Sequence, residues 1–171
     1  MVRENPAVVK KDLQSVISQP GKPKLGYEIK SAIRDIEENL GYYTIKNAIL
    51  IGAGKLGQAL LGYVGFDKYG FNILAGFDTN PELVGKTITD KNIYDISKMQ
   101  EYIKENNILI AIVTVPTKYA QEVTTKAIEA GVRAIWNFAP THLELPENIV
   151  VRNEDMAASL AILSKELKNK I

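Results

Sequence analysis

The chain has 171 residues, of which 46% are hydrophobic and 24% are charged, and this composition is typical of a soluble globular protein. Its formal net charge of +1 excludes a strong overall field that would attract nucleic acid or a membrane surface. The absence of cysteine excludes disulfides, thiolate metal sites and cysteine nucleophiles, and it fits a reducing compartment.

The first segment, about residues 1–41, is expected to hold two helices. Asn5 and Pro6 are typical of an N-cap and a first helical position, and the pattern continues to about residue 17. Two prolines and two glycines then separate this helix from a second one over about 27–40. The N-terminus has no apolar stretch like that of a signal peptide, and no apolar run reaches the ~18 residues that span a bilayer, so a cytoplasmic location is expected.

Positive charge is concentrated in the first 24 residues, where five basic side chains outnumber two acidic ones. Lysines on a short helix and on the loop that follows it form a candidate surface for phosphate contacts with DNA. The alternative is a solvated helix face, which charge alone favours. The candidate DNA-contacting residues are Lys10, Lys11, Lys22 and Lys24.

The second segment, about residues 45–152, alternates strand and helix patterns. This alternation predicts an α/β fold with a parallel sheet and right-handed crossovers. The expected strands are 47–51, 71–77, 108–113, 133–137 and 149–152, and the expected helices are 55–64, 96–106 and 117–130.

A glycine motif follows the first expected strand. Gly52, Gly54 and Gly57 have the G-x-G-x-x-G spacing, which suits a tight turn, a close approach of the backbone to a pyrophosphate, and close packing of helix on strand. Asp78 ends the next expected strand, where a carboxylate accepts hydrogen bonds from a ribose diol and repels a 2′-phosphate. The motif therefore predicts an NAD(H) site, and the alternative is a glycine-rich turn that only reverses the chain.

Two further segments lie where later strands should end. They are Thr114-Val115-Pro116 and Asn137-Phe138-Ala139, the second followed by a proline. Ligands of open parallel sheets bind outside the carboxyl ends of the strands, so both segments are candidates for the ligand pocket. Their alternative role is strand termination before a proline.

Little in the chain points to catalysis. The single histidine, His142, lies in a loop and is more often a surface residue than an acid or base, and no metal-ligand spacing is found. The chain leaves little room for a substrate domain, so it is interpreted as a binder of NAD(H) rather than an enzyme. A small NAD-dependent oxidoreductase remains one alternative, and a module for CoA or another nucleotide remains a second.

The third segment, about residues 153–171, is expected to be a helix. Leu160, Leu163 and Leu167 recur at helical spacing, and either Asn153 or Asp155 is a candidate N-cap.

Residues 5–13 read N-P-A-V-V-K-K-D-L, and residues 52–60 read G-A-G-K-L-G-Q-A-L. Through these motifs the chain resembles the Rex family of NADH-responsive bacterial redox repressors, whose recognition helix has the pattern N-P-A-Q-V-R-K-D-L and whose glycine turn has the pattern G-A-G-N-L-G-x-A-L. The segments 114–116, 137–140 and 153–157 match the family in order and spacing. The resemblance implies a winged helix, a Rossmann-type domain and a C-terminal helix exchanged within a homodimer, with NADH binding that releases operator DNA.

The resemblance also implies roles for individual residues. Tyr94 and Asp155 match a tyrosine and an aspartate that couple redox state to domain arrangement, and the alternatives are a packed tyrosine and a helix cap. The cofactor-binding residues are expected to be Gly52, Ala53, Gly54, Lys55, Leu56, Gly57, Asp78, Thr114, Val115, Pro116, Asn137, Phe138 and Ala139.

Three departures from the family pattern are visible. The family's winged helix normally begins before this point, so residues 1–41 are expected to form an incomplete winged-helix remnant that binds DNA only if the domain is completed. Lys10 stands for an arginine, which removes bidentate recognition of phosphate or guanine. Lys55 stands for an asparagine and adds a positive charge near the expected pyrophosphate position.

Overall fold

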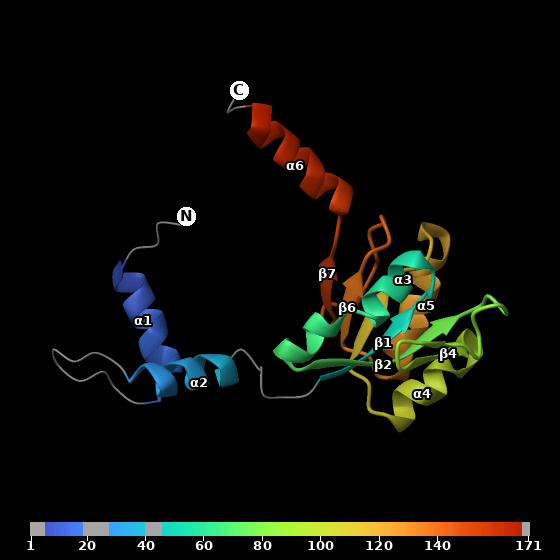
Figure 1. The fold of residues 1–171 in the computed structure, drawn as a ribbon, viewed down its shortest axis with the longest axis horizontal. Helices are drawn as coiled ribbons and strands as arrows, with labels where there is room; N and C mark the ends of the chain where they lie inside the picture. Colours follow the sequence, from blue (N-terminus) through green and yellow to red (C-terminus); the bar gives the residue numbers. More distant parts are fainter. Residues whose placement is uncertain (1–5, 19–27, 40–45, 169–171) are drawn as a thin grey trace. The chain divides into compact units, whose positions relative to one another are not determined.

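The computed structural model describes residues 6–18, 28–39 and 46–168. The chain divides into two compact units, and each is described by itself (Figure 1). The first comprises residues 1–45 together with 65–70, and the second comprises residues 46–64 and 71–171. None of the helices in the described ranges is both long and apolar enough to cross a membrane.

The first unit contains the two predicted helices, α1 (Pro6–Val16) and α2 (Ile29–Asn39). The backbone N–H and the hydroxyl of Ser18 both donate to Oδ2 of Asp35, at 2.8 and 2.7 Å, and so join the end of α1 to α2. The predicted cap, Asn5, and the proline- and glycine-rich segment after Ser18 lie outside the described residues.

The second unit is built on a seven-stranded sheet in the order β3-β4-β2-β1-β5-β6-β7. All neighbouring strands are parallel except β3 and β4, so the predicted α/β fold with a parallel sheet is confirmed. The strands are β1 (Lys46–Ile51), β2 (Phe71–Asp78), β3 (Thr87–Ile88), β4 (Lys91–Asp95), β5 (Ile110–Val113), β6 (Ala134–Asn137) and β7 (Val150–Asn153).

Two of these strands, β3 and β4, are absent from the sequence-based prediction. The sequence of β4, Lys-Asn-Ile-Tyr-Asp, has no clear apolar run, and β3 has only two residues. Backbone pairing with β2 nevertheless holds β4 in the sheet and buries Ile93. Tertiary contact therefore overrode the weak local pattern, and the β3–β4 pair makes one edge antiparallel.

The helices of the second unit follow the strands as predicted; α5 (Thr117–Ala130) has the predicted bounds, and the others are shorter than predicted. Helix α3 (Lys55–Leu61) ends at Leu61, with Gly62 as its C-cap, instead of at residue 64, and the chain continues as the 3₁₀ helix η1 (Val64–Tyr69). The helix expected over 96–106 is the 3₁₀ turn η2 (Ile96–Lys98) followed by α4 (Met99–Glu105). Helices α5 (Thr117–Ala130) and α6 (Met156–Lys168) complete the chain.

Strand β1 is buried on both faces, as its continuous apolar sequence predicts. Ile49 and Ile51 belong to the core cluster that also contains Phe77 of β2 and Ile103 of α4. Leu50, on the other face, packs beside α3, where its side chain lies close to Gly57. The sheet therefore forms a middle layer, and the end of β1 is held firmly between two helical layers.

The last strand and the last helix differ from this core. All four residues of β7 are exposed, and every described residue of α6 is exposed as well. Leu160 is 68% exposed and Leu163 is 60% exposed, although both are apolar and lie at helical spacing. The single chain thus leaves the apolar side chains of α6 in contact with solvent.

Candidate functional site

Backbone hydrogen bonds connect the carboxyl ends of the central strands. The N–H of Gly52 donates to Phe77 O at 2.8 Å, and the N–H of Thr114 donates to Ile51 O at 2.9 Å. The N–H of Phe138 donates to the carbonyl of β5's last residue at 2.8 Å. The glycine turn, Asp78, Thr114–Pro116 and Asn137–Ala139 are therefore all found at the ends of the adjacent strands β2, β1, β5 and β6, as the sequence predicts.

The three motif glycines have different physical roles. Gly52 has a φ of +97°, which favours glycine, and a Cβ there would lie 2.8 Å from Cγ1 of Val115. A Cβ on Gly57 would collide with the backbone oxygen of Gly52 and lie 2.9 Å from Leu50 Cδ2, so α3 packs closely on β1 only because Gly57 has no side chain. Gly54 is exposed and a Cβ on it would meet nothing within 4 Å, so the space above it is open to a ligand.

Thr114 is bonded to the glycine turn. Its hydroxyl oxygen lies 2.6 Å from Gly52 O and 3.2 Å from Ile51 O, and it donates its single proton there. Thr114 and Val115 are half-buried against the turn, whereas Pro116 is exposed at the start of α5. Thr114 therefore holds the glycine turn through its hydroxyl, a contribution that its position in the sequence did not reveal.

The Asp78 carboxylate makes two hydrogen bonds to the backbone around it. Oδ2 accepts from the N–H of Ala53 at 2.6 Å, and Oδ1 accepts from the N–H of Asn80 at 2.8 Å. Each carboxylate oxygen can accept a further hydrogen bond, so the half-buried group keeps capacity for a ligand's hydroxyls. Asp78 is thus held at the glycine turn by its two backbone hydrogen bonds.

Gln58 is a site residue that sequence reasoning missed. Its Nε2 donates to the carbonyl of Ala53 at 2.9 Å. The Ala53 backbone is therefore bonded to two side chains, its N–H to Asp78 and its carbonyl to Gln58. Glutamine is common on helix surfaces, and nothing in the sequence marks this one as part of the turn.

Asn137 ends β6 and is fully buried. Its Oδ1 accepts from the N–H of Ala139 at 3.0 Å, and its Nδ2 donates to Ala139 O at 3.1 Å. Phe138 is half-buried, and its ring lies 4.6 Å from that of Trp136 between centroids. The Asn137 side chain therefore holds the Phe138–Ala139 turn through its two bonds to Ala139. The backbone of that turn lies next to the end of β5, which Thr114 follows.

Within one chain, Tyr94 and Asp155 lie near opposite edges of the sheet, on β4 and directly after β7. Tyr94 packs with Phe77 and Tyr102, at ring-centroid distances of 5.9 and 5.5 Å, and burial raises the pKa of Tyr102. Asp155 follows β7 and its Oδ1 accepts from Ala158 N at 2.8 Å, which makes it the cap of α6. Four strands separate β4 from β7, or about 24 Å at the usual strand spacing, so a single chain does not bring the two side chains together.

The remaining candidate residues are at the surface or outside the described regions. Lys55 and Lys11 are exposed, and Leu56 is half-buried. The side chain of Lys10 and the whole of Lys22 and Lys24 lie outside what the structure describes. His142 is exposed in the loop after β6.

Comparison with known proteins identifies both the domain and the family. Residues 43–141 match the family model described as CoA binding domain. The redox-sensing transcriptional repressor Rex of Treponema denticola is 40% identical over 165 residues, which covers 96% of this chain and 78% of that protein.

Solved structures agree with this assignment. RSP, a Rex-family repressor, has been solved in complex with beta-NAD+ and operator DNA. That structure is similar to the present one with a TM-score of 0.88 and 33% sequence identity, over 97% of this chain and 76% of the RSP chain. RSP in complex with beta-NADH gives a TM-score of 0.83 and 33% identity over 96% of this chain and 76% of that chain. The chain therefore belongs to the Rex family of redox-sensing transcriptional repressors.

Proposed function

We propose that this chain binds NADH and NAD+ at the ends of β1, β2, β5 and β6 and regulates transcription as a repressor, with NADH binding releasing operator DNA. The observation that carries the proposal is Asp78 held at the glycine turn by Ala53 N–H. Membership of the family, with relatives named as redox-sensing repressors, supports the same function. A regulator of this kind acts in the cytoplasm and needs no catalytic residue.

The turn has the features that a dinucleotide requires. A pyrophosphate would approach the backbone at Gly54, where the space is open, and the exposed Lys55 would add a positive charge beside it. Asp78 would accept hydrogen bonds from the ribose hydroxyls of the adenosine half, and Thr114–Pro116 and Asn137–Ala139 would line the path to the nicotinamide. The nicotinamide supplies the redox state that is sensed, and the protein supplies only the binding surface.

Calorimetry with NADH, NAD+, NADPH and CoA tests this proposal directly. We expect NADH to bind most tightly and NADPH more weakly by about tenfold or more, because Asp78 would face its 2′-phosphate. Tighter binding of CoA than of NADH would overturn the proposal. CoA is the alternative ligand that deserves this comparison, because the family model over residues 43–141 is described by that ligand.

DNA binding is the second part of the proposal, and Lys11 on α1 is the described basic residue that bears on it. Gel shifts with the operator DNA of a Rex-family repressor, with and without NADH, provide the test. We expect Lys11→Ala to weaken binding and to reduce its salt dependence, because a lost phosphate contact releases fewer counterions. Binding that is independent of both NADH and Lys11 would contradict the repressor role.

We also propose that the functional molecule is a homodimer joined through α6. The exposed apolar side chains of α6 support a partner that covers them. The separation of Tyr94 from Asp155 within one chain supports it too, because a redox-coupling contact between them would have to involve two copies. The proposed domains are accordingly 1–41, 45–152 and 153–171.

The alternative of a small NAD-dependent oxidoreductase is tested by NADH oxidation with a panel of small carbonyl substrates. Turnover that depends on His142 would support an enzyme, whereas no turnover in a protein that binds NADH supports the regulator.

A further inference from the structure

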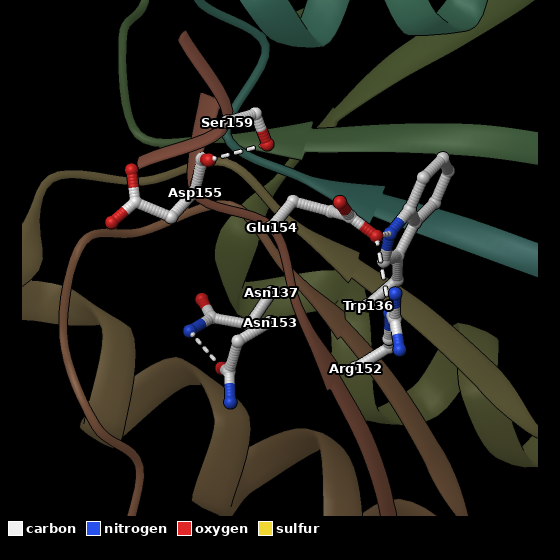
Figure 2. Close-up of polar contacts among 7 residues, drawn as sticks. All are labelled: Trp136, Asn137, Arg152, Asn153, Glu154, Asp155 and Ser159. Carbon is white, nitrogen blue, oxygen red and sulfur yellow. Dashed lines mark hydrogen bonds and ion pairs between the residues drawn. The ribbon is translucent and has the colours of Figure 1, made fainter. Parts of the chain in front are cut away.

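The buried amide of Asn137 connects two segments that are distant in sequence (Figure 2). Its Nδ2 donates to Ala139 O at 3.1 Å, to Thr141 O at 3.2 Å and to Asn153 Oδ1 at 2.9 Å. The orientation of the amide follows from the N–H of Ala139, which must face an oxygen and lies 3.0 Å from Asn137 Oδ1. Asn137 therefore links the turn after β6 to the last residue of β7.

Three acceptors compete for the two protons of this amide. A side-chain amide has two N–H donors, so the three oxygens around Nδ2 share them. Because Asn137 is fully buried, no solvent compensates for a lost partner, and any shift of one acceptor changes the bonds to the others. A movement of Ala139 or Thr141 thus changes the hydrogen bond that reaches Asn153.

The segment that follows the Phe138–Ala139 turn is anchored a few residues later, which restricts its movement. Gln121 of α5 holds the loop at Glu144, with Oε1 accepting from Glu144 N at 2.8 Å and Nε2 donating to Glu144 O at 3.0 Å. Leu143 is buried in the core beside this anchor. The segment between Asn137 and Leu143 is consequently fixed at both ends, and a ligand against Phe138–Ala139 acts on the Asn137 amide.

The other end of the link is the entry to α6. The N–H of Glu154 donates to Asn137 O at 2.8 Å, and Asp155 begins the helix as its cap. Helix α6 has 13 residues and none of them is buried in the chain, so within one chain it is held to the sheet by this entry and not by packed side chains. A change in how the chain leaves Asn153 therefore changes how α6 leaves the sheet, and with it the packing that protects the α6 amides in the proposed dimer.

We infer that the Asn137–Asn153 contact is the point through which a nucleotide at the Phe138–Ala139 turn acts on α6, with Asn153 as the positioning residue. The inference rests on the proposed function, because it requires a nucleotide at that turn. Asn153 itself is exposed and is not among the expected ligand-binding residues, so its substitution removes the acceptor of Asn137 Nδ2 and leaves those residues unchanged.

Hydrogen exchange of the α6 amides, measured with and without NADH, tests this inference. In the wild-type protein we expect NADH to change the exchange rates over residues 156–168 by about fivefold or more. Asn153→Ala removes the Oδ1 acceptor, and we expect it to abolish this response while NADH affinity stays within about threefold. Asn153→Asp retains an acceptor for Asn137 Nδ2 and should restore the response.

Arg152→Ala is the matched control. It lies on the same strand and breaks the 3.5 Å ion pair with Glu154 while leaving the Asn153 acceptor in place, so the response should persist. If Asn153→Ala fails to fold, Asn153→Ser supplies the same comparison, since its shorter side chain does not extend to Asn137 Nδ2. If Asn153→Ala or Asn153→Ser folds and still shows the full exchange response to NADH, the inference is overturned. A loss of NADH affinity of about tenfold or more in these variants also overturns it, because the Asn137–Asn153 contact would then be part of the nucleotide site itself. Wild-type protein that binds no NADH overturns the proposed function and the inference together, and the binding measurement on wild type distinguishes this case.

Discussion

The Asp78 carboxylate accepts a hydrogen bond of 2.6 Å from the backbone N–H of Ala53, which lies 25 residues earlier in the chain. The residue that would recognise the ribose therefore also holds the turn that is proposed to bind the pyrophosphate. One carboxylate joins the two halves of the proposed adenosine site before any ligand arrives. A substitution there affects both the shape of the turn and the contact with the sugar.

Asp78→Ala should weaken NADH binding by about tenfold or more, because a charge-assisted contact to the ribose is lost and the turn loses its bond to Ala53. NADPH should be affected less, because the same change removes a repulsion of its 2′-phosphate. The ratio of the two affinities, measured by calorimetry, separates recognition from a general distortion of the turn. Asp90→Ala is the control, since Asp90 is an exposed carboxylate whose side chain contacts Lys91. An unchanged NADH-to-NADPH ratio would show that Asp78 only shapes the turn.

Alanine at Gly54 should affect NADH binding without affecting stability, whereas alanine at Gly57 should lower the stability of the fold. Gly54 has a φ of −66°, which any residue adopts, and a Cβ there meets no protein atom within 4 Å. Gly54→Ala should therefore leave the unfolding temperature unchanged and weaken NADH binding by blocking the pyrophosphate. Gly57→Ala should lower the free energy of unfolding by about 2 kcal/mol, because its Cβ collides with the Gly52 carbonyl. Thermal denaturation and calorimetry on both variants provide the measurement, and an unstable Gly54→Ala would refute the assignment of open space there.

The Ser18–Asp35 contact should weaken in acid. The Ser18 hydroxyl and N–H both donate to Asp35, and they hold the pKa of this carboxyl below its ordinary value of 3.8. A depressed pKa means that the contact stabilises the α1–α2 pair fully above that ordinary value and is lost as the pH falls through the lowered one. Titration of Asp35 by NMR should give a midpoint below 3.8, and Ser18→Ala should raise it.

Ser31→Ala serves as the control for that titration, because the hydroxyl of Ser31 in α2 donates to the carbonyl of Glu28, just before the helix, and not to Asp35. A midpoint that stays unchanged in Ser18→Ala would mean that the hydroxyl does not stabilise the charged carboxyl.

Removal of the residues after Asn153 should convert dimers to monomers. Each leucine of α6 that a partner covers contributes about 1.5–3 kcal/mol, and Leu160, Leu163 and Leu167 are all more than half exposed in the single chain. The double substitution Leu160→Glu with Leu163→Glu should have the same effect as the truncation. Sedimentation velocity on the three proteins measures the outcome, and an intact dimer without α6 would place the interface elsewhere.

Local sequence was sufficient for the centre of the sheet and insufficient for its edge. The apolar run 47–51, the glycine spacing and Asp78 each carry a strong local pattern, so β1, the turn and the end of β2 were predicted together. Strand β4 carries no such pattern, because its two apolar residues are flanked by polar ones, and only pairing with β2 makes it a strand. Its neighbour β3 is too short to leave any periodic signal.

The sequence by itself determined the family and predicted the ligand class, since both depend on short motifs whose backbone requirements are local. Only the tertiary structure decided which side chains hold those motifs in place. The bonds from Thr114 to Gly52, from Gln58 to Ala53 and from Asn137 to Asn153 join residues whose partners no spacing rule identifies. The physical reason is that hydrogen bonds between strand ends depend on the order of strands in the sheet, which residue patterns along the chain do not encode directly.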